Sequence, residues 1–253
     1  MTAKRTLALR PNPGAAVPET AMVMAAGLGK RMRPLTATRP KPLVPVAGKP
    51  LIDHVFDRLR AAGVRRAVVN VHYLADALEA HLKARVKDVE VVVSDERALL
   101  LETGGGLVKA RPLLGDDPVV VINADSFWVD GPIDAIRALA AAWDERRMDV
   151  LLLMVPYARA HGYRGQGDFH LDALGRITGR RQRGRVAPFV YIGVQMIHPR
   201  VIADAPEGPF STNVFWSRAI AAGRAWGLVH GGLWFEIGEP AAIAEAEAIL
   251  ADG

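Results

Sequence analysis

Apolar residues are concentrated in short runs separated by more polar stretches. Runs rich in Val, Met, Ile and Ala occupy residues 21–26, 67–71, 89–94, 119–123 and 150–155. Each is shorter than an ordinary helix, and continuous apolar character over a few residues is typical of strands buried on both faces of a parallel sheet. The pattern therefore predicts a series of buried parallel strands.

The stretches between these runs have helical spacing. Residues 51–59 place Leu, Ile, Val and Phe on one helical face, and Gly63 follows where such a helix would end. Residues 73–84 and 131–143 follow the same spacing, and a further short helix is expected over 107–111. Alternating strands and helices predict βαβ crossovers and a doubly wound sheet, whose ligand lies at the carboxyl ends of the strands.

The alternation of strand-like and helix-like segments ends after about Tyr157, where Gly and Arg become frequent. Short strands are expected near 168–171 and 188–197, and the last 40 or so residues return to helix, strand and an Ala-rich helix over 240–250. We therefore predict an α/β fold: a Rossmann-like, doubly wound, mostly parallel sheet with helices on both faces, and a smaller irregular α+β substrate-binding part. Residues 1–20 are expected to form a flexible N-terminal tail, and residues 21–253 a single domain.

Composition narrows the class of protein. The chain has 253 residues, of which 50% are hydrophobic, so it can bury a sizeable core. No apolar run approaches the roughly 18–20 residues that span a bilayer, so we expect a soluble, cytoplasmic protein with no membrane partner. Cysteine is absent, which excludes a disulfide framework, a thiolate zinc site and a cysteine nucleophile.

Charge points to anionic ligands. The chain carries 32 Lys and Arg against 27 Asp and Glu, and no lysine follows Lys109. A modest basic excess spread along an α/β chain suits small phosphates better than a nucleic acid, and the Arg-rich stretch lacks the interleaved aromatic residues of a single-strand binding surface. We expect no nucleic-acid partner.

The first predicted strand leads directly into a glycine loop, Ala26-Gly27-Leu28-Gly29-Lys30-Arg31. Two glycines after a strand let backbone N–H groups approach a phosphate, and the neighbouring cations add charge. The string is neither a Walker A loop nor a dinucleotide fingerprint, and alone it is equally compatible with an ordinary tight turn. The prolines on both sides of Lys41 stiffen the segment that presents its ammonium group.

The string from residue 24 to 51 resembles the signature of the sugar-1-phosphate nucleotidyltransferases, which join a nucleoside triphosphate to a sugar 1-phosphate and release pyrophosphate. The resemblance implies Mg²⁺ as cofactor, a nucleotide-binding half over 21–156 and a sugar-phosphate-binding half over 157–253. It assigns charge neutralisation in catalysis to Arg31 and Lys41. The nucleotide contacts it implies in this region are Ala26, Gly27, Gly29, Lys30, Arg31 and Lys41.

A second glycine run, Glu102-Thr103-Gly104-Gly105-Gly106, lies before the short predicted helix. Three consecutive glycines predict a loop that another group approaches closely, or simply a flexible loop. The resemblance places the run beside the base and sugar, with Gly104 and Gly105 as nucleotide contacts and Glu102 as a substrate contact. The string is similar to that of the branch containing the N-acetylmuramate-1-phosphate uridylyltransferases.

Two carboxylates are candidate metal ligands. Asp125 directly follows the predicted strand 119–123, and hard oxygen ligands of this kind suit Mg²⁺. The resemblance makes Asp125 both a metal ligand and a catalytic residue. It suggests a second ligand at Glu236, where the family usually has Asp; the alternative is that Glu236 only caps or packs.

The sugar phosphate needs a cation, and the second half has no lysine to supply one. Five arginines lie between residues 176 and 185, and Arg180 or Arg181 is the expected replacement, against the alternative of a solvated basic loop. The resemblance adds sugar contacts at Asn123, Gly167 and Gly193.

The prediction is thus a Mg²⁺-dependent enzyme whose substrates are a nucleoside triphosphate and a sugar 1-phosphate. UTP and N-acetylmuramate 1-phosphate, a step of cell-wall recycling, are the first choice. Guanylyl transfer to mannose or heptose 1-phosphate is the alternative within the class. A catalytically weak regulatory homologue that binds nucleotide sugars is the alternative outside it. The oligomeric state is left open.

Overall fold

The computed structural model describes residues 14–252. The predicted tail, residues 1–20, falls mostly outside this part of the chain, and the same holds for residue 253. The described portion of the tail, 14–19, leads into the first strand, β1 (Thr20–Met24). The division into nucleotide and sugar-phosphate halves remains a prediction.

The parallel half of the sheet is built around β1. Its neighbours on the two sides are β4 and β6, and β5 lies beyond β4, all parallel. These strands are β4 (Arg66–Val71), β5 (Glu90–Asp95) and β6 (Val119–Asn123). Each lies within one residue or two of its predicted position, because the buried apolar runs define them.

The second half of the chain completes the same sheet. Strand β12 (Phe189–Ile197) inserts antiparallel between β6 and β8 (Val150–Pro156), and β13 (Ala225–Val229) pairs with β8 in parallel. The edge is formed by β10 (Phe169–Leu171) and β11 (Ile177–Arg180). The α/β, mostly parallel fold is confirmed, with one correction. The run 150–155 has an antiparallel neighbour, because the long buried strand β12 separates it from β6.

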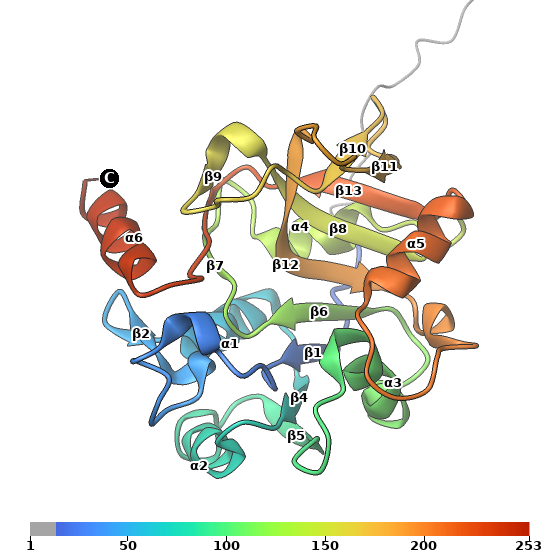
Figure 1. The fold of residues 1–253 in the computed structure, drawn as a ribbon. Coiled ribbons are helices and arrows are strands. Elements are labelled where there is room, and N and C mark those ends of the chain that lie inside the picture. Colours follow the sequence, from blue (N-terminus) through green and yellow to red (C-terminus); the bar gives the residue numbers. More distant parts are fainter. Residues whose placement is uncertain (1–13, 253) are drawn as a thin grey trace, which may run out of the picture.

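Helices cover both faces of the sheet (Figure 1). Helices α1, α2 and α4 contribute to one buried apolar cluster, and α3 and α5 to the other. The helices are α1 (Leu51–Ala62), α2 (Ala75–Arg85), α3 (Glu102–Leu114), α4 (Ala135–Ala142), α5 (Asn213–Ala221) and α6 (Ala241–Ala251). Within residues 14–252, no helix is long and apolar enough to cross a membrane.

Two helix boundaries show how local chemistry sets them. Helix α1 ends at Gly63, whose φ of 93° lies in the left-handed region that glycine adopts without strain. Helix α4 begins four residues later than the predicted 131, since the Asp134 carboxylate accepts a hydrogen bond from the Arg137 N–H and caps the helix there.

Smaller elements surround the site. Strand β14 (Leu233–Phe235) pairs with β7 (Phe127–Val129) and β9 (Ala160–His161), and β2 (Pro45–Val46) pairs with β3 (Lys49–Pro50). Short 3₁₀ turns are η1 (Lys30–Met32), η2 (Lys41–Leu43), η3 (Tyr157–Arg159) and η4 (Pro199–Ile202). Four tryptophans are buried: Trp128, Trp216, Trp226 and Trp234.

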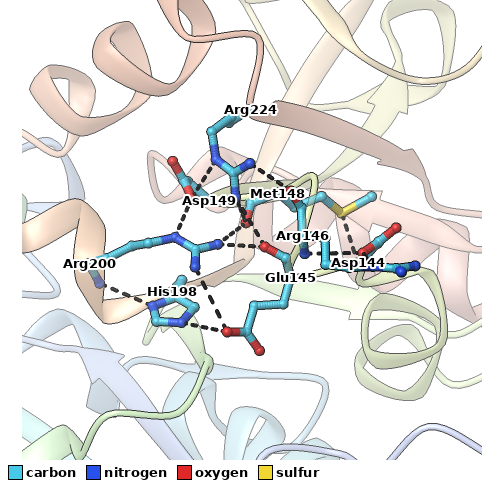
Figure 2. A network of polar contacts seen from close by, with 8 residues as sticks. All are labelled: Asp144, Glu145, Arg146, Met148, Asp149, His198, Arg200 and Arg224. Atoms are coloured by element: carbon cyan, nitrogen blue, oxygen red, sulfur yellow. Dashed lines mark hydrogen bonds and ion pairs between the residues drawn. The ribbon is translucent and has the colours of Figure 1, made fainter.

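A polar network closes the amino end of β8 (Figure 2). The Asp149 carboxylate accepts hydrogen bonds from Nε of Arg200, at 2.6 Å, and pairs with Nε of Arg224, at 2.9 Å. Other nitrogens of the two guanidinium groups donate to the main-chain oxygens of Glu145 and Met148. The network ties the α4–β8 connection to η4 and β13. It lies at the amino end of β8, and so at the opposite end of the strands from the candidate site.

Candidate active site

A cavity lies at the carboxyl ends of β1 and β6. It measures about 570 Å³ and is lined by the glycine loop, η2, the start of α3 and the residues after β6. Of the predicted site residues it brings together Ala26, Gly27, Gly29, Lys30, Arg31, Lys41, Glu102, Asn123 and Asp125. We call it the glycine-loop cavity.

The glycine loop is held by hydrogen bonds from outside itself. Gly29 has a φ of 59°, and its carbonyl accepts a hydrogen bond from the buried Thr36 hydroxyl at 2.8 Å. A Cβ at Gly29 would lie 3.0 Å from the Cβ of Lys41, so the loop approaches η2 closely. A Cβ at Gly27 would meet no atom within 4 Å, which leaves open space above that backbone for a ligand.

Lys41 and Asp125 meet inside the cavity. The Lys41 Nζ donates to Oδ2 of Asp125 at 2.5 Å, which joins η2 to the end of β6. The Lys41 side chain is 14% exposed and that of Asp125 is 38% exposed, so the ammonium is the more enclosed partner. A predicted phosphate-neutralising cation and the predicted metal carboxylate are therefore in direct contact.

Glu236 faces the same site from the residue after β14. It lines a second cavity of about 210 Å³ that shares Arg31, Lys41, Asn123 and Asp125 with the glycine-loop cavity. Its Oε1 lies 3.8 Å from a guanidinium nitrogen of Arg31. Burial raises the pKa of Glu236 above its ordinary value of 4.5, and Arg31 and Lys41 oppose that effect only in part.

The two carboxylates suit a magnesium ion. Residues 14–252 contain no cluster of three or more His, Cys, Asp and Glu side chains that could hold a metal alone. Mg²⁺, however, is usually bound by one or two carboxylates together with phosphate oxygens of the substrate. Asp125 and Glu236, which both line the second cavity, meet that requirement.

The close approach of another group that the second glycine run predicts is confirmed, but the predicted loop is wrong. The run is not a loop: α3 begins at Glu102, so Gly104 and Gly105 lie in its first turn and outside the cavity lining. Both N–H groups donate to the carbonyl of Phe210, and a Cβ at Gly104 would lie 2.4 Å from its ring. The glycines are required by packing, while Glu102 and Thr103 reach the cavity.

The predicted sugar contacts fall into two groups. Gly193 lines the second cavity, and a Cβ there would lie 2.1 Å from the Ser126 hydroxyl and 3.0 Å from the Asn123 amide nitrogen. Gly167, Arg180 and Arg181 line a third cavity of about 360 Å³. The second and third cavities share Tyr191, so the expected phosphate grip of Arg180 and Arg181 lies one cavity away from Lys41 and Asp125.

Sequence reasoning missed a buried pair beneath the site. Asn70 accepts a hydrogen bond from the N–H of Ala25 at 2.6 Å and donates to Glu96 at 2.8 Å. Glu96, fully buried, also accepts from the N–H of Leu101 at 3.1 Å. The pair fixes the end of β1 against the start of α3. A polar residue inside the apolar run 67–71 was the available signal.

Tyr163 was also missed. Its ring lines the second cavity, and its hydroxyl donates to Oδ1 of Asp168 at 3.2 Å. Burial, together with the charge of Asp168, raises the pKa of Tyr163 to about 12. The other carboxylate oxygen of Asp168 accepts from the N–H of Tyr191, so Asp168 fixes two aromatic residues of the site.

Residues 20–177 match the family model described as nucleotidyl transferase. The chain therefore belongs to the nucleotidyl transferase family, and its expected place among the sugar-1-phosphate nucleotidyltransferases, a class of enzymes, is confirmed.

Similar curated proteins support the expected branch. The chain is 51% identical over 238 residues to the N-acetylmuramate alpha-1-phosphate uridylyltransferase of Caulobacter vibrioides, covering 93% of this chain and 98% of that protein. It is 33% identical over 231 residues to the protein of the same name from Neisseria meningitidis serogroup B, covering 90% and 97%. A mannose-1-phosphate guanylyltransferase catalytic subunit beta, from Xenopus tropicalis, is 28% identical, covering 87% and 61%.

Solved structures share the fold. The inositol-1-phosphate CTP transferase from T. maritima superposes with a TM-score of 0.76 at 20% identity, covering 94% of this chain and 96% of that one. At this identity the likeness concerns the architecture alone, and it confirms the Rossmann-like α/β assignment.

Proposed function

We propose that this enzyme transfers a uridylyl group from UTP to N-acetylmuramate 1-phosphate, giving UDP-N-acetylmuramate and pyrophosphate. The observation that carries the proposal is the convergence of the glycine loop, Lys41 and Asp125 on one cavity. The choice of base and sugar rests on the 51% identity to an N-acetylmuramate alpha-1-phosphate uridylyltransferase over almost the whole chain. The reaction would belong to cell-wall recycling in the cytoplasm.

The triphosphate would lie over the glycine loop. The open space above Gly27 admits a phosphate against the backbone, and Lys30 and Arg31 at the rim supply positive charge. The base would lie toward Asn70, Glu102 and the other residues where α3 begins. This orientation directs the α-phosphate toward Lys41, between the glycine-loop cavity and the second cavity.

The chemical step needs alignment more than acid–base catalysis. The attacking oxygen belongs to the phosphate of the sugar 1-phosphate, which is already an anion, so no side chain has to remove a proton. In-line attack requires the two phosphates to approach despite their charge, and the fixed cations Lys41 and Arg31 offset that repulsion.

Asp125 and Glu236 would hold the magnesium ion. When bound, Mg²⁺ would neutralise phosphate oxygens and link the two substrates. The contact with Lys41 fixes the carboxylate of Asp125 in the direction of the cavity, and Glu236 approaches from β14. Glu in place of the family's usual Asp is one methylene longer, which suits a ligand presented from the opposite wall.

The sugar would occupy the second cavity. Gly193 has no side chain to fill the space beside Asn123, so a sugar ring can lie against the backbone there. Tyr163, Tyr191 and Trp234 form apolar walls of this cavity. Gly167, Arg180 and Arg181 form the next cavity outward, so they would contact the far side of the sugar.

Pyrophosphate release over a grid of nucleoside triphosphates and sugar 1-phosphates, with and without Mg²⁺, tests the proposal. We expect the highest kcat/KM for UTP with N-acetylmuramate 1-phosphate, and no turnover after chelation. Preference for GTP with mannose 1-phosphate would favour the guanylyltransferase alternative, to which a 28% identical relative points. Nucleotide-sugar binding without turnover for any pair would identify a regulatory homologue.

A further inference from the structure

The guanidinium group of Arg180 has no acidic partner. It donates from one terminal nitrogen to Oδ1 of Asn213 at 2.8 Å and from the other to the main-chain oxygen of the same residue at 3.0 Å. Its Nε is buried and makes no hydrogen bond, and no ion pair joins Arg180 to the described residues. Arg180 therefore forms no ion pair with a described residue, and the only carboxylate whose charge acts on it is that of Asp168.

Aromatic rings hold this guanidinium in place. It lies 5.5 Å from the ring centroid of Phe169 and 5.7 Å from that of Trp216. Stacking of this kind fixes the plane of the guanidinium, and burial lowers the pKa of Arg180. A partly desolvated, fixed cation that forms no ion pair with the described residues is suited to bind an anionic ligand group.

The position of Arg180 separates it from the reacting phosphates. A further cavity of about 260 Å³ connects the Arg180 cavity to Thr103 and Asn123 of the glycine-loop cavity, but Lys41 and Asp125 line neither of these two cavities. The Arg180 cavity shares only Tyr191 with the second cavity. The attacking phosphate must lie within about 3–3.5 Å of the α-phosphorus, which places it with Lys41 and Asp125. Arg180 is thus left facing the outer side of the sugar.

Given the proposed function, the sugar carries a second anion on that side. N-acetylmuramate differs from N-acetylglucosamine by a lactyl ether on O3, which ends in a carboxylate. We propose that Arg180 binds the lactyl carboxylate of the sugar and selects N-acetylmuramate, rather than gripping the sugar phosphate. A carboxylate can accept two parallel, charge-assisted hydrogen bonds from a guanidinium, which a neutral hydroxyl cannot do.

Asp168, the acidic residue that lines the Arg180 cavity, makes its hydrogen bonds with residues other than Arg180. Both carboxylate oxygens of Asp168 accept hydrogen bonds, one from the Tyr163 hydroxyl and the other from the N–H of Tyr191. Arg181, although it lines the same cavity, is exposed and donates to Gln166. Arg180 is therefore the enclosed, pre-positioned cation of the pair.

The test compares two ligands that differ in one charge. Binding of UDP-N-acetylmuramate and of its lactyl amide is measured by calorimetry with the native enzyme and with Arg180→Ala. The amide loses a hydrogen bond between two charged groups, so we expect it to bind the native enzyme at least about tenfold more weakly than the carboxylate does. With Arg180→Ala we expect the two ligands to bind within about twofold of each other, because the group that distinguishes them is gone.

Arg183→Ala is the matched control. Arg183 is an exposed arginine of the same segment that lines none of the three cavities, and its substitution removes the same charge. It should retain the preference for the carboxylate. Equal binding of both ligands to the native enzyme, or an undiminished preference in Arg180→Ala, would overturn the inference. The native-enzyme comparison needs no substitution, so it decides even where Arg180→Ala folds poorly.

Failure of the proposed function gives a different result. In that case the native enzyme would release no pyrophosphate from UTP and N-acetylmuramate 1-phosphate. Turnover of this pair together with indifference to the lactyl charge would contradict the role of Arg180 alone.

Discussion

The ammonium of Lys41 lies 2.5 Å from Oδ2 of Asp125, although the two residues are 84 positions apart in the chain. One comes from η2, stiffened by prolines on both sides, and the other from the residues that follow β6. The contact places the Lys41 ammonium and the Asp125 carboxylate, a candidate metal ligand, where the glycine-loop cavity and the second cavity join. It defines where the phosphates are expected to meet.

Lys41→Met should reduce kcat by about two to three orders of magnitude, because a fixed positive charge is lost where negative charge accumulates. The side chain is largely enclosed, and methionine has a similar length, so the melting temperature should change little. Steady-state kinetics with UTP and N-acetylmuramate 1-phosphate measures the effect. A variant with near-normal kcat would remove Lys41 from the chemical step.

Glu236→Gln should separate stability from activity. For an acid whose pKa is raised in the folded state, stability is fully present below the unfolded pKa and is lost as the pH rises through the folded value. In the absence of Mg²⁺, the variant should therefore melt at a higher temperature than the native enzyme near pH 7. The difference should vanish below the ordinary value of 4.5.

The same variant should need more Mg²⁺ for half-maximal activity, since it loses a carboxylate oxygen beside the phosphates. Magnesium titrations of pyrophosphate release at fixed substrate concentrations provide the readout. An unchanged magnesium requirement would assign Glu236 to packing alone, whatever the melting temperature shows.

Two glycine substitutions should affect different properties, one the binding of UTP and the other the stability of the fold. Gly27→Ala adds a methyl group that meets no protein atom within 4 Å, so the fold should be unaffected while KM for UTP rises by at least about tenfold. Gly105→Ala places a Cβ 2.5 Å from the carbonyl oxygen of Gly208, which should lower the free energy of unfolding by about 1–3 kcal/mol. Chemical denaturation and initial rates, measured on both variants, check the contrast. Equal losses of stability would contradict the distinction between the open loop and the packed helix turn.

The network of Figure 2 should matter for stability alone. Asp149→Asn weakens two charge-assisted contacts, to Arg200 and Arg224, and should cost about 1–3 kcal/mol while leaving kcat unchanged. Asp116→Asn is a suitable control, because the Asp116 side chain is 94% exposed and its pairing with Arg111 should contribute at most about 1 kcal/mol. A loss of kcat in Asp149→Asn would show that the network at the amino end of β8 is coupled to the candidate active site.

Local sequence signals predicted the parallel half of the fold well. The runs 21–26, 67–71 and 119–123 are buried almost throughout, and the run 89–94, at the edge of the sheet, is half-buried, so apolar character identifies all four. Gly63 marks the end of α1. The insertion of β12 beside β6 could not be predicted in this way. It depends on pairing between segments about 70 residues apart, and pairing order leaves no local pattern.

The candidate site likewise has features that local sequence predicts and features that depend on residues distant in the chain. The glycine loop, Lys41 and Asp125 follow strand ends directly, so their convergence could be predicted from the sequence. The packing role of Gly104 depends on Phe210, a residue distant in the sequence. The separation of Arg180 from Lys41 and Asp125 depends on which strands bring their cavities together. Neither relationship is encoded by residues nearby in the chain.

We propose that Asp125, held by Lys41, serves a magnesium-dependent uridylyl transfer. The most direct measurement is pyrophosphate release from UTP and N-acetylmuramate 1-phosphate by Asp125→Asn, across a magnesium titration and beside the native enzyme. We expect kcat to fall by about two to four orders of magnitude and not to be restored by excess Mg²⁺, while the melting temperature shows that the variant remains folded. Near-native turnover by Asp125→Asn would contradict the proposal.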